Sequence, residues 1–154
     1  MLAAWDDAEI RRWMRPPPPD AARALAYVRS CENDWADDAR YTWAVCAPTT
    51  GEMLGEIALA GVDLLLGTAE VSCWALPVAR RQGMTTAALG AVLRFAFGAL
   101  VLHRVEYSWA APNAVSARVA AACGFTVEGR RREAWPDGEG RVDLMLAGRL
   151  AHDP

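Results

Sequence analysis

The chain has 154 residues, of which 53% are hydrophobic and 23% charged, a composition that fits one globular domain over residues 1–154 and argues against disorder. Its formal net charge is −3, so a sequence-independent interaction with nucleic acid is not expected, although a local basic pocket for one ligand is compatible with it. The four cysteines lack metal-type spacing, and neither a signal peptide nor a membrane-spanning run is found, which favours a reduced cytoplasmic protein without a metal.

Two helices are predicted before the first strand. Apolar spacing over residues 4–14 indicates a short helix that Asp6 or Asp7 can cap, and the prolines at 16–19 end it in an extended segment. Asp20 is expected to cap the second helix. The apolar stripe of this second helix is expected to consist of Ala21, Ala24, Leu25 and Val28.

Six strands are predicted along the rest of the chain, from β-forming side chains bounded by turn residues. They are residues 41–47, 53–60, 70–76, 104–110, 125–132 and 141–147. The first two form a hairpin around the turn at 48–51, whereas residues 61–68 receive no assignment. Asn113 is expected to cap a helix over residues 114–123 that closes at Gly124.

The stretch of residues 70–93 has the order strand, basic turn, helix. Pro77 ends the strand, and apolar residues recur at helical spacing after Gly83. The first amides of a helix have no internal partner, and Gly83 leaves the approach to them open, so the turn is suited to an anion. Because Arg80 and Arg81 stand beside this turn, a phosphate or pyrophosphate is the expected guest.

The complete order of elements is two helices, three strands, a helix, a strand, a helix and two strands. This order predicts a mixed sheet with helices on both faces, in an α/β layered domain. Four short motifs follow one another along the chain. They are Trp74-Ala75-Leu76-Pro77, Arg80-x-x-Gly83-x-Thr85, Pro112-Asn113-x-x-Ser116 and Cys123-Gly124-Phe125-x-x-Glu128-Gly129.

Taken together, these motifs resemble the GNAT superfamily of acetyl-CoA-dependent N-acetyltransferases, most closely its RimJ/RimL-type branch of ribosomal-protein N-terminal acetyltransferases. The resemblance implies the GNAT fold, with a mostly antiparallel central sheet that splays between two strands. In that family, the loop (Q/R)-x-x-G-x-(G/A) holds the pyrophosphate of the cofactor by its backbone amides. The motif residues here are Arg80, Gly83 and Thr85, and the resemblance implies that the pyrophosphate contacts come from the amides of Arg81, Gln82, Gly83, Met84, Thr85 and Thr86.

The resemblance also implies the position of the rest of acetyl-CoA. The strand before the turn pairs with the pantetheine arm in the family, which corresponds here to Cys73, Trp74 and Ala75. Asn113 is expected near the pantetheine, and Ser116 near the sulfur.

Acetyl transfer to an amine needs a base, a donor for the oxyanion and an acid for the leaving thiolate. The resemblance implies direct attack in a ternary complex, with a strand N–H near Trp74 holding the oxyanion and Ser116 donating to the thiolate. Many relatives have a tyrosine seven residues after the asparagine, where this chain has Ala120, which favours Ser116 or a water. Glu70 and Glu106 are both candidates for the base, each acting through water; the alternative for each is a solvated carboxylate or an arginine partner.

Two departures from the family pattern affect these expectations. The family's first strand is missing, through truncation or because the fold lacks it, so the strand at 41–47 is expected to have an edge covered by another subunit, giving a homodimer, or by the N-terminal segment. Thr85 replaces the usual glycine or alanine, which favours weaker cofactor binding. The alternative function is therefore a catalytically weak or inactive GNAT-like module that binds acyl-CoA. The acceptor stays open between a peptide N-terminus and a small amine, and Trp13 and Trp135 are expected at its mouth.

Overall fold

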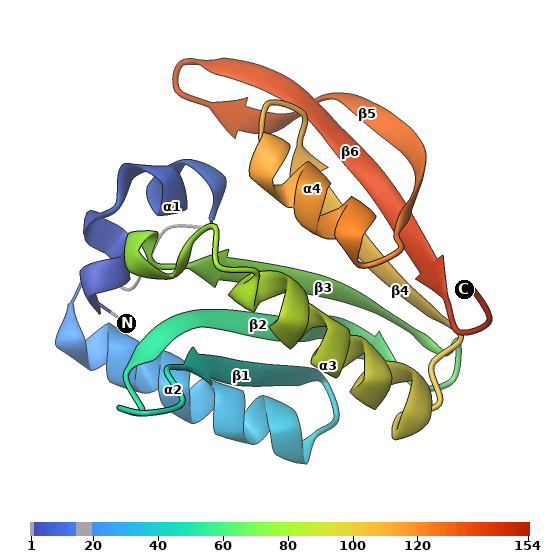
Figure 1. The fold of residues 1–154 in the computed structure, drawn as a ribbon, viewed down its shortest axis with the longest axis horizontal. Coiled ribbons are helices and arrows are strands. Elements are labelled where there is room, and N and C mark those ends of the chain that lie inside the picture. Colours follow the sequence, from blue (N-terminus) through green and yellow to red (C-terminus); the bar gives the residue numbers. More distant parts are fainter. Residues whose placement is uncertain (1, 15–19) are drawn as a thin grey trace.

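Six strands form one open sheet in the order β1-β2-β3-β4-β6-β5 (Figure 1). The structure is a computed structural model that describes residues 2–14 and 20–154, so the predicted extended prolines at 16–19 lie outside the described residues. The strands are β1 (Arg40–Cys46), β2 (Met53–Asp63), β3 (Thr68–Ala75), β4 (Arg104–Ala110), β5 (Thr126–Asp137) and β6 (Gly140–Leu150). The mixed, mostly antiparallel sheet expected from the sequence is confirmed.

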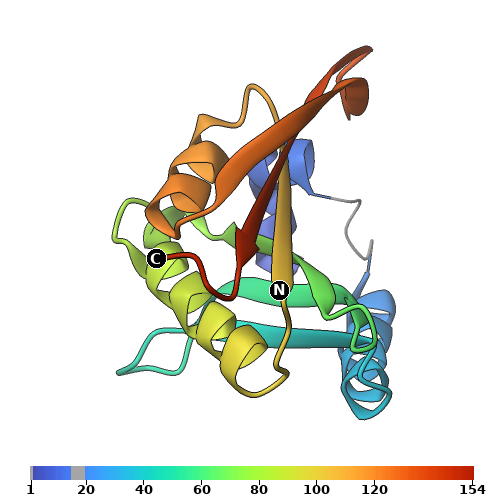
Figure 2. The same ribbon diagram turned by 90° about the vertical axis from the view of Figure 1, so that its right-hand side faces the viewer.

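Helices cover both faces of this sheet. They are the 3₁₀ helices η1 (Leu2–Asp6) and η2 (Pro77–Ala79), and the α-helices α1 (Ala8–Trp13), α2 (Ala21–Ala36), α3 (Met84–Gly98) and α4 (Ala114–Ala122). Helices α3 and α4 lie on one face, and α2 lies on the other (Figure 2). In the described part of the chain, no helix is both long enough and apolar enough to cross a bilayer.

The segment at 61–68, which the sequence left unassigned, continues one strand and opens the next. Strand β2 extends to Asp63, whose carboxylate accepts hydrogen bonds from the amides of Leu65 and Leu66 in the following turn. Strand β3 then begins at Thr68. Strands β1 to β3 therefore form an antiparallel meander, and the predicted hairpin of the first two strands is confirmed.

The sheet has two halves that meet at one short parallel pairing. Strands β3 and β4 pair only from Thr68 with Arg104 to Val71 with Tyr107, and no pairing continues beyond those residues. On either side of this junction, every recorded pairing is antiparallel. The remainder of β3 is thus bonded on its β2 side alone, which is the splay that the sequence predicted.

The main hydrophobic core fills the space between the sheet and helices α3 and α4. Its most deeply buried side chains come from strands β2, β3 and β4 and from helix α3, and include Ile57, Leu59, Val71, Val105 and Leu89. This packing fixes the start of α3 beside the end of β3. The turn between them is therefore held at both ends by elements that pack in the core.

The inner face of α2 differs from the predicted apolar stripe. Leu25 and Val28 are exposed, at 54% and 44% of their accessible surface, so the expectation that they form the buried face is wrong. The half-buried positions of the helix are Ala24, Tyr27, Cys31 and Asp34. Tyr27 turns inward because its hydroxyl donates a hydrogen bond to the buried carboxylate of Glu56, at 2.8 Å.

The N-terminal segment forms two short helices, η1 and α1, over residues 2–13. Helix η1 packs its Ala4 against Trp74, near the end of β3. Helix α2, and not this segment, lies against the edge strand β1, where the indole N–H of Trp35 donates to the backbone oxygen of Thr42 at 3.2 Å. Cover from the N-terminal side of the chain is therefore given by α2 and not by the two short helices before it, and the second subunit stays a prediction.

Candidate active site

The turn between β3 and α3 presents a set of unpaired backbone amides. Gly83 is the N-cap of α3 with φ of 71°, and Arg81 has φ of 62°, so two residues of the turn adopt the left-handed conformation. Among the described residues, no backbone acceptor is found for the amides of Arg81, Gln82 and Gly83. The first amides of α3, which no intrahelical bond can satisfy, follow directly. All six residues that the sequence assigned to the pyrophosphate, 81–86, lie in this segment.

The open side of β3 carries further free amides next to this turn. The amide of Leu76 donates to Leu54 of β2 at 2.8 Å, and amide directions alternate along a strand. The amides of Cys73 and Ala75 therefore point away from β2, toward the side where β4 has separated. Because the amide of Trp74 points toward β2, an oxyanion donor near Trp74 must come from one of its two neighbours.

A cavity of about 820 Å³ lies where β3 and β4 separate. On the side of helix α4 it is lined by Cys73, Tyr107, Asn113 and Ser116, and on the opposite face of the sheet by Glu56, Glu70, Glu106 and Ser108. Trp13 and Trp135, which the sequence placed at the acceptor mouth, both line it. The cavity therefore brings together the predicted catalytic residues with Cys73 and Trp74 of the predicted cofactor site, whereas Ala75 and the turn at 80–86 are not among its lining residues.

Tyr107 is a buried hydroxyl in this cavity that the sequence analysis missed. Its side chain is 4% exposed, and its hydroxyl lies 3.4 Å from the Sγ atom of Cys73 on the facing strand. Burial raises the pKa of the Tyr107 phenol, and the neighbouring Cys73 adds to this, whereas the Ser116 hydroxyl opposes it. The phenol is thus protonated at physiological pH. The sequence could have indicated this position. Side chains alternate along a strand, so Tyr107 lies on the face opposite to Glu106 and Ser108.

Asn113 and Ser116 are joined at the start of α4. The Asn113 side chain caps the helix by accepting a hydrogen bond from the Ser116 amide at 3.1 Å, as predicted. Among the described residues, the Ser116 hydroxyl has no recorded bond to its own helical turn. Both side chains line the cavity, and the hydroxyl of Ser116 is available to a ligand there.

The two predicted bases differ in their surroundings. Glu70 accepts a hydrogen bond from the hydroxyl of Ser108, a neutral donor. Glu106 is paired with Arg104, with an N–O distance of 3.0 Å, and its side chain is 55% exposed. Arg104 also pairs with Glu128. Glu106 thus has the arginine partner that the sequence analysis left as an alternative. Glu70 is exposed, which matches the solvated carboxylate of that alternative, and it has no ion pair among the described residues.

Glu56 is a second carboxylate that the sequence analysis did not single out. It is the one charged side chain among the buried residues of the described chain, at 6% exposure. It accepts a hydrogen bond from Tyr27 and lies 3.9 Å from the guanidinium of Arg40. These two partners offset the free-energy cost of burying the Glu56 carboxylate. They come from α2 and β1, and so from elements other than the strand that carries Glu56.

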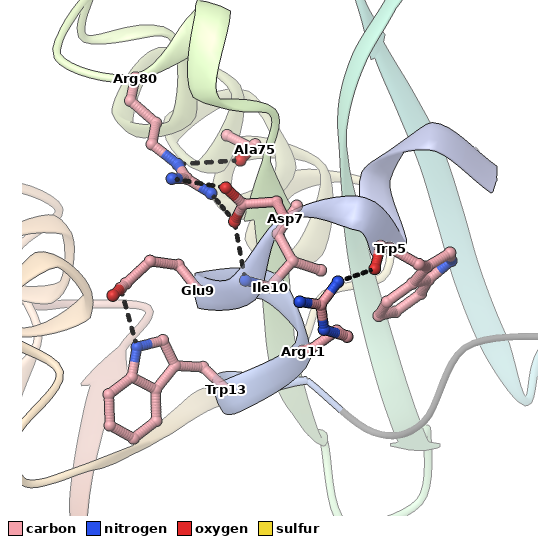
Figure 3. Close-up of polar contacts among 8 residues, drawn as sticks. All are labelled: Trp5, Asp7, Glu9, Ile10, Arg11, Trp13, Ala75 and Arg80. Atoms are coloured by element: carbon pink, nitrogen blue, oxygen red, sulfur yellow. Dashed lines mark hydrogen bonds and ion pairs between the residues drawn. The ribbon is translucent and has the colours of Figure 1, made fainter.

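The two arginines beside the turn have different roles in the structure. The guanidinium of Arg80 donates to the carboxylate of Asp7 and, through Nε, to the backbone oxygen of Ala75 at 3.3 Å (Figure 3). Arg81 has no hydrogen bond or ion pair within residues 2–14 and 20–154. Of the two side chains expected beside the phosphates, Arg80 is therefore occupied by Asp7, and Arg81 is the one available to an anion.

The chain was compared with known protein families, curated sequences and solved structures. A model of the acetyltransferase (GNAT) domain matches residues 1–126 of the chain. No curated protein sequence matches it.

Three solved structures are similar over most of the chain. Ribosomal-protein-S5-alanine acetyltransferase from Vibrio fischeri has a TM-score of 0.87 at 16% identity, over 95% of this chain and 82% of its own. RimJ from Mycobacterium smegmatis, in complex with CoA-disulfide, has a TM-score of 0.86 at 22% identity, over 97% and 73%. Spermidine N-acetyltransferase from Vibrio cholerae, in complex with CoA and spermine, has a TM-score of 0.85 at 18% identity, over 98% and 88%.

Proposed function

Because the chain belongs to the GNAT acetyltransferase family, we propose that it transfers the acetyl group of acetyl-CoA to a primary amine by direct attack within a ternary complex. The family and the enzyme class expected from the sequence are confirmed by the domain match, and the fold by the solved structures. The presence of RimJ among these structures fits the expected branch.

The observation that carries this proposal is the continuity of unpaired amides from β3 into α3. The open amides of Cys73 and Ala75 lead along the strand to the turn at 81–83, and from there to the helix N-terminus. An extended amide-containing arm that ends in a diphosphate matches such a path, because the strand edge pairs with the arm and the helix terminus favours the anion. Arg81 adds a positive charge at the diphosphate end. Acetyl-CoA, when bound there, supplies the activated acetyl thioester.

Attack on the thioester requires the acceptor amine to lose a proton. We assign this proton to Glu70, directly or through one water, because its hydrogen-bond partner among residues 2–14 and 20–154 is the neutral Ser108 hydroxyl. The amine nitrogen then bonds to the acetyl carbon while the carbon–sulfur bond breaks. The amide of Cys73 or Ala75 donates to the oxyanion that develops on the acetyl oxygen.

The sulfur leaves as a thiolate and must be stabilised or protonated. Ser116 is the proposed donor, because its hydroxyl lines the cavity without a recorded bond to its own turn. Tyr107 is buried behind Ser116 and keeps its own proton, so it supports the Ser116 hydroxyl through a hydrogen bond and is not itself a proton source. This arrangement replaces the tyrosine that many family members place where this chain has Ala120.

The acceptor is proposed to be a peptide N-terminus or a small amine. The similar structures act on ribosomal protein S5 alanine or on spermidine, according to their names, and both substrates present a primary amine. The mouth of the cavity combines tryptophans with carboxylates, which suits an amine attached to an apolar or extended group. We place the protein in the cytoplasm, where free thiols such as its four cysteines are maintained.

Two measurements test the proposal. Calorimetry with acetyl-CoA should give saturable binding that Gly83→Val weakens strongly. A thiol-release assay over a panel of spermine, spermidine and short peptides with N-terminal alanine or serine should then identify an acceptor. Tight binding without thiol release on any amine would instead favour the acyl-CoA-binding module.

A further inference from the structure

Helix α1 carries two arginine–carboxylate pairs that leave it in opposite directions. Asp7, the N-cap of the helix, pairs with Arg80 at the turn before α3. Arg12, in the last turn of the helix, pairs with Asp137 at the tip of the hairpin formed by β5 and β6. A helix of six residues is thereby attached to both halves of the sheet.

The pair between Asp7 and Arg80 is fixed at three points. Arg80 contacts both carboxylate oxygens, at 2.5 Å from Nη2 and 3.3 Å from Nη1 (Figure 3). Its Nε atom donates to the backbone oxygen of Ala75, which orients the guanidinium plane. Asp7 also accepts a hydrogen bond from the amide of Ile10 at 2.9 Å, so the same carboxylate caps the helix and binds the turn. Both side chains are less than one-third exposed, which limits the weakening of the pair by solvent.

The pair at the other end is bidentate. The Nε and Nη2 atoms of Arg12 each lie 2.8 Å from one oxygen of Asp137. The guanidinium also lies over the ring of Trp13, 4.3 Å from its centroid, and the indole N–H of Trp13 donates to Glu9 at 3.2 Å. Arg12 therefore holds the hairpin tip and the tryptophan at the cavity mouth in one arrangement.

Between these two attachments, α1 lies over the mouth of the cavity. Ile10 is 4% exposed and packs with Trp74, whereas Trp5, Trp13 and Met14 line the cavity. Within the sheet, the two halves are joined by the short pairing of β3 with β4, and beneath it by the core shared between α3 and α4, so the open end of the sheet is not bridged by strand pairing. In Figure 1, α1 and the tip of the β5–β6 hairpin lie near each other at the open end of the sheet.

We propose that α1 is a tie across the open end of the splayed sheet, and that Asp7, Arg80, Arg12 and Asp137 are positioning residues that set the width of the acceptor mouth. This inference rests on the proposed acetyltransferase function, because it assigns the mouth to the amine. Loss of either pair widens the mouth and weakens acceptor binding. Loss of the pair between Arg12 and Asp137 leaves cofactor binding unchanged, because both residues bond to each other and not to the turn before α3.

The variants Asp7→Asn and Asp137→Asn test the attachment of α1 separately from the capping of the helix. Asparagine caps a helix as well as aspartate does, so Asp7→Asn removes the charge of the pair and keeps the cap. Asp20→Asn is the matched control, because Asp20 caps α2 by accepting from the amide of Arg23 and, within the part of the chain that the structure describes, has no ion pair with an arginine. The double variant Arg12→Asp/Asp137→Arg restores the distal pair with reversed polarity.

Each variant is assayed for thiol release with the best amine of the panel named above, and for hydrogen exchange of the peptide covering residues 8–14. We expect Asp7→Asn and Asp137→Asn to raise the acceptor KM about three- to tenfold and to speed exchange of this peptide, whereas kcat stays within about twofold. Calorimetry with coenzyme A should give the wild-type dissociation constant for Asp137→Asn. The reversed pair should recover most of the acceptor KM.

An acceptor KM within twofold of wild type for both single variants, with unchanged exchange of residues 8–14, would overturn the tie. A larger change for the control Asp20→Asn would overturn it as well. If the wild-type protein releases no thiol with any amine of the panel, the proposed function fails. The exchange measurement then decides the tie on its own, because faster exchange of residues 8–14 in both variants requires the two attachments and no acceptor.

Discussion

The Sγ atom of Cys73 and the hydroxyl of Tyr107 lie 3.4 Å apart across the point where β3 and β4 cease to pair. One side chain comes from each wall of the splay, so this contact marks the inner end of the cavity. Burial raises the pKa of the Cys73 thiol, and among the described residues no histidine lines the cavity to activate it. Both groups of the pair therefore stay protonated and pack together at this position, and neither is a nucleophile.

Removal of the Ser116 hydroxyl should slow the chemical step. We expect Ser116→Ala to lower kcat about 100-fold with little change in the KM of acetyl-CoA, because a donor to the leaving thiolate acts only as charge develops on sulfur. Tyr107→Phe should lower kcat about tenfold, since Ser116 remains. If the two hydroxyls act in series, the double variant is no slower than Ser116→Ala. Steady-state thiol release measures all three, and an unchanged kcat for Ser116→Ala would exclude its role.

A side chain at Gly83 should weaken cofactor binding. A Cβ there meets no atom within 4 Å, so the effect comes from the positive φ of 71°, which costs a residue with a side chain about 1 kcal/mol. We expect Gly83→Ala to lower acetyl-CoA affinity about five- to tenfold, because relief of this strain turns the amides away from the phosphates. Gly98→Ala is the control, since Gly98 lies in the last turn of α3 with open space and no positive φ. That variant should bind acetyl-CoA normally and unfold at the same or a higher temperature.

The local parts of the fold could be predicted from the sequence because short-range signals determine them. Asp20 and Asn113 each cap the helix that they were predicted to cap, Asp7 is the cap of α1 out of the two candidates Asp6 and Asp7, and Gly124 follows the last turn of α4 with φ of 76°. The strand, turn and helix around Gly83 also follow from residues next to one another. Each of the three capping side chains accepts a hydrogen bond from the backbone amide three residues later, so the local sequence is enough to predict the cap.

The features that sequence reasoning missed depend on partners far apart in the chain. Arg12 and Asp137 are separated by 125 residues, and Asp7 and Arg80 by 73, so no local pattern indicates either pair. The inner face of α2 was misassigned because the bond from Tyr27 to Glu56 outweighs the apolar character of Leu25 and Val28. Tertiary contacts decided these positions.

The attachment of α1 should depend on pH in a predictable direction. The hydrogen bond from Arg80, partly opposed by burial, holds the pKa of Asp7 below its ordinary value of 3.8. A carboxyl whose pKa is lowered by folding stabilises the fold above its unfolded pKa, and this contribution is lost as the pH falls through the folded pKa. Asp7→Asn should therefore reduce the free energy of unfolding by about 0.5–1 kcal/mol at pH 7 and by much less at pH 2.5. Urea titrations at both pH values measure it, and an equal difference at both would show that the pair contributes nothing.

Glu70 and Glu106 should differ in their contribution to catalysis although they face each other in the register of β3 and β4. The charge of Glu106 is already balanced by Arg104, whereas the recorded partner of Glu70 is the neutral hydroxyl of Ser108. We expect Glu70→Gln to lower kcat/KM about 10- to 100-fold, because a glutamine cannot accept the amine proton. Glu106→Gln is the matched control on the facing strand and should change kcat/KM less than about threefold. Measurement of kcat/KM from pH 6 to 9 distinguishes the two, and a larger loss for Glu106→Gln would move the base to that strand.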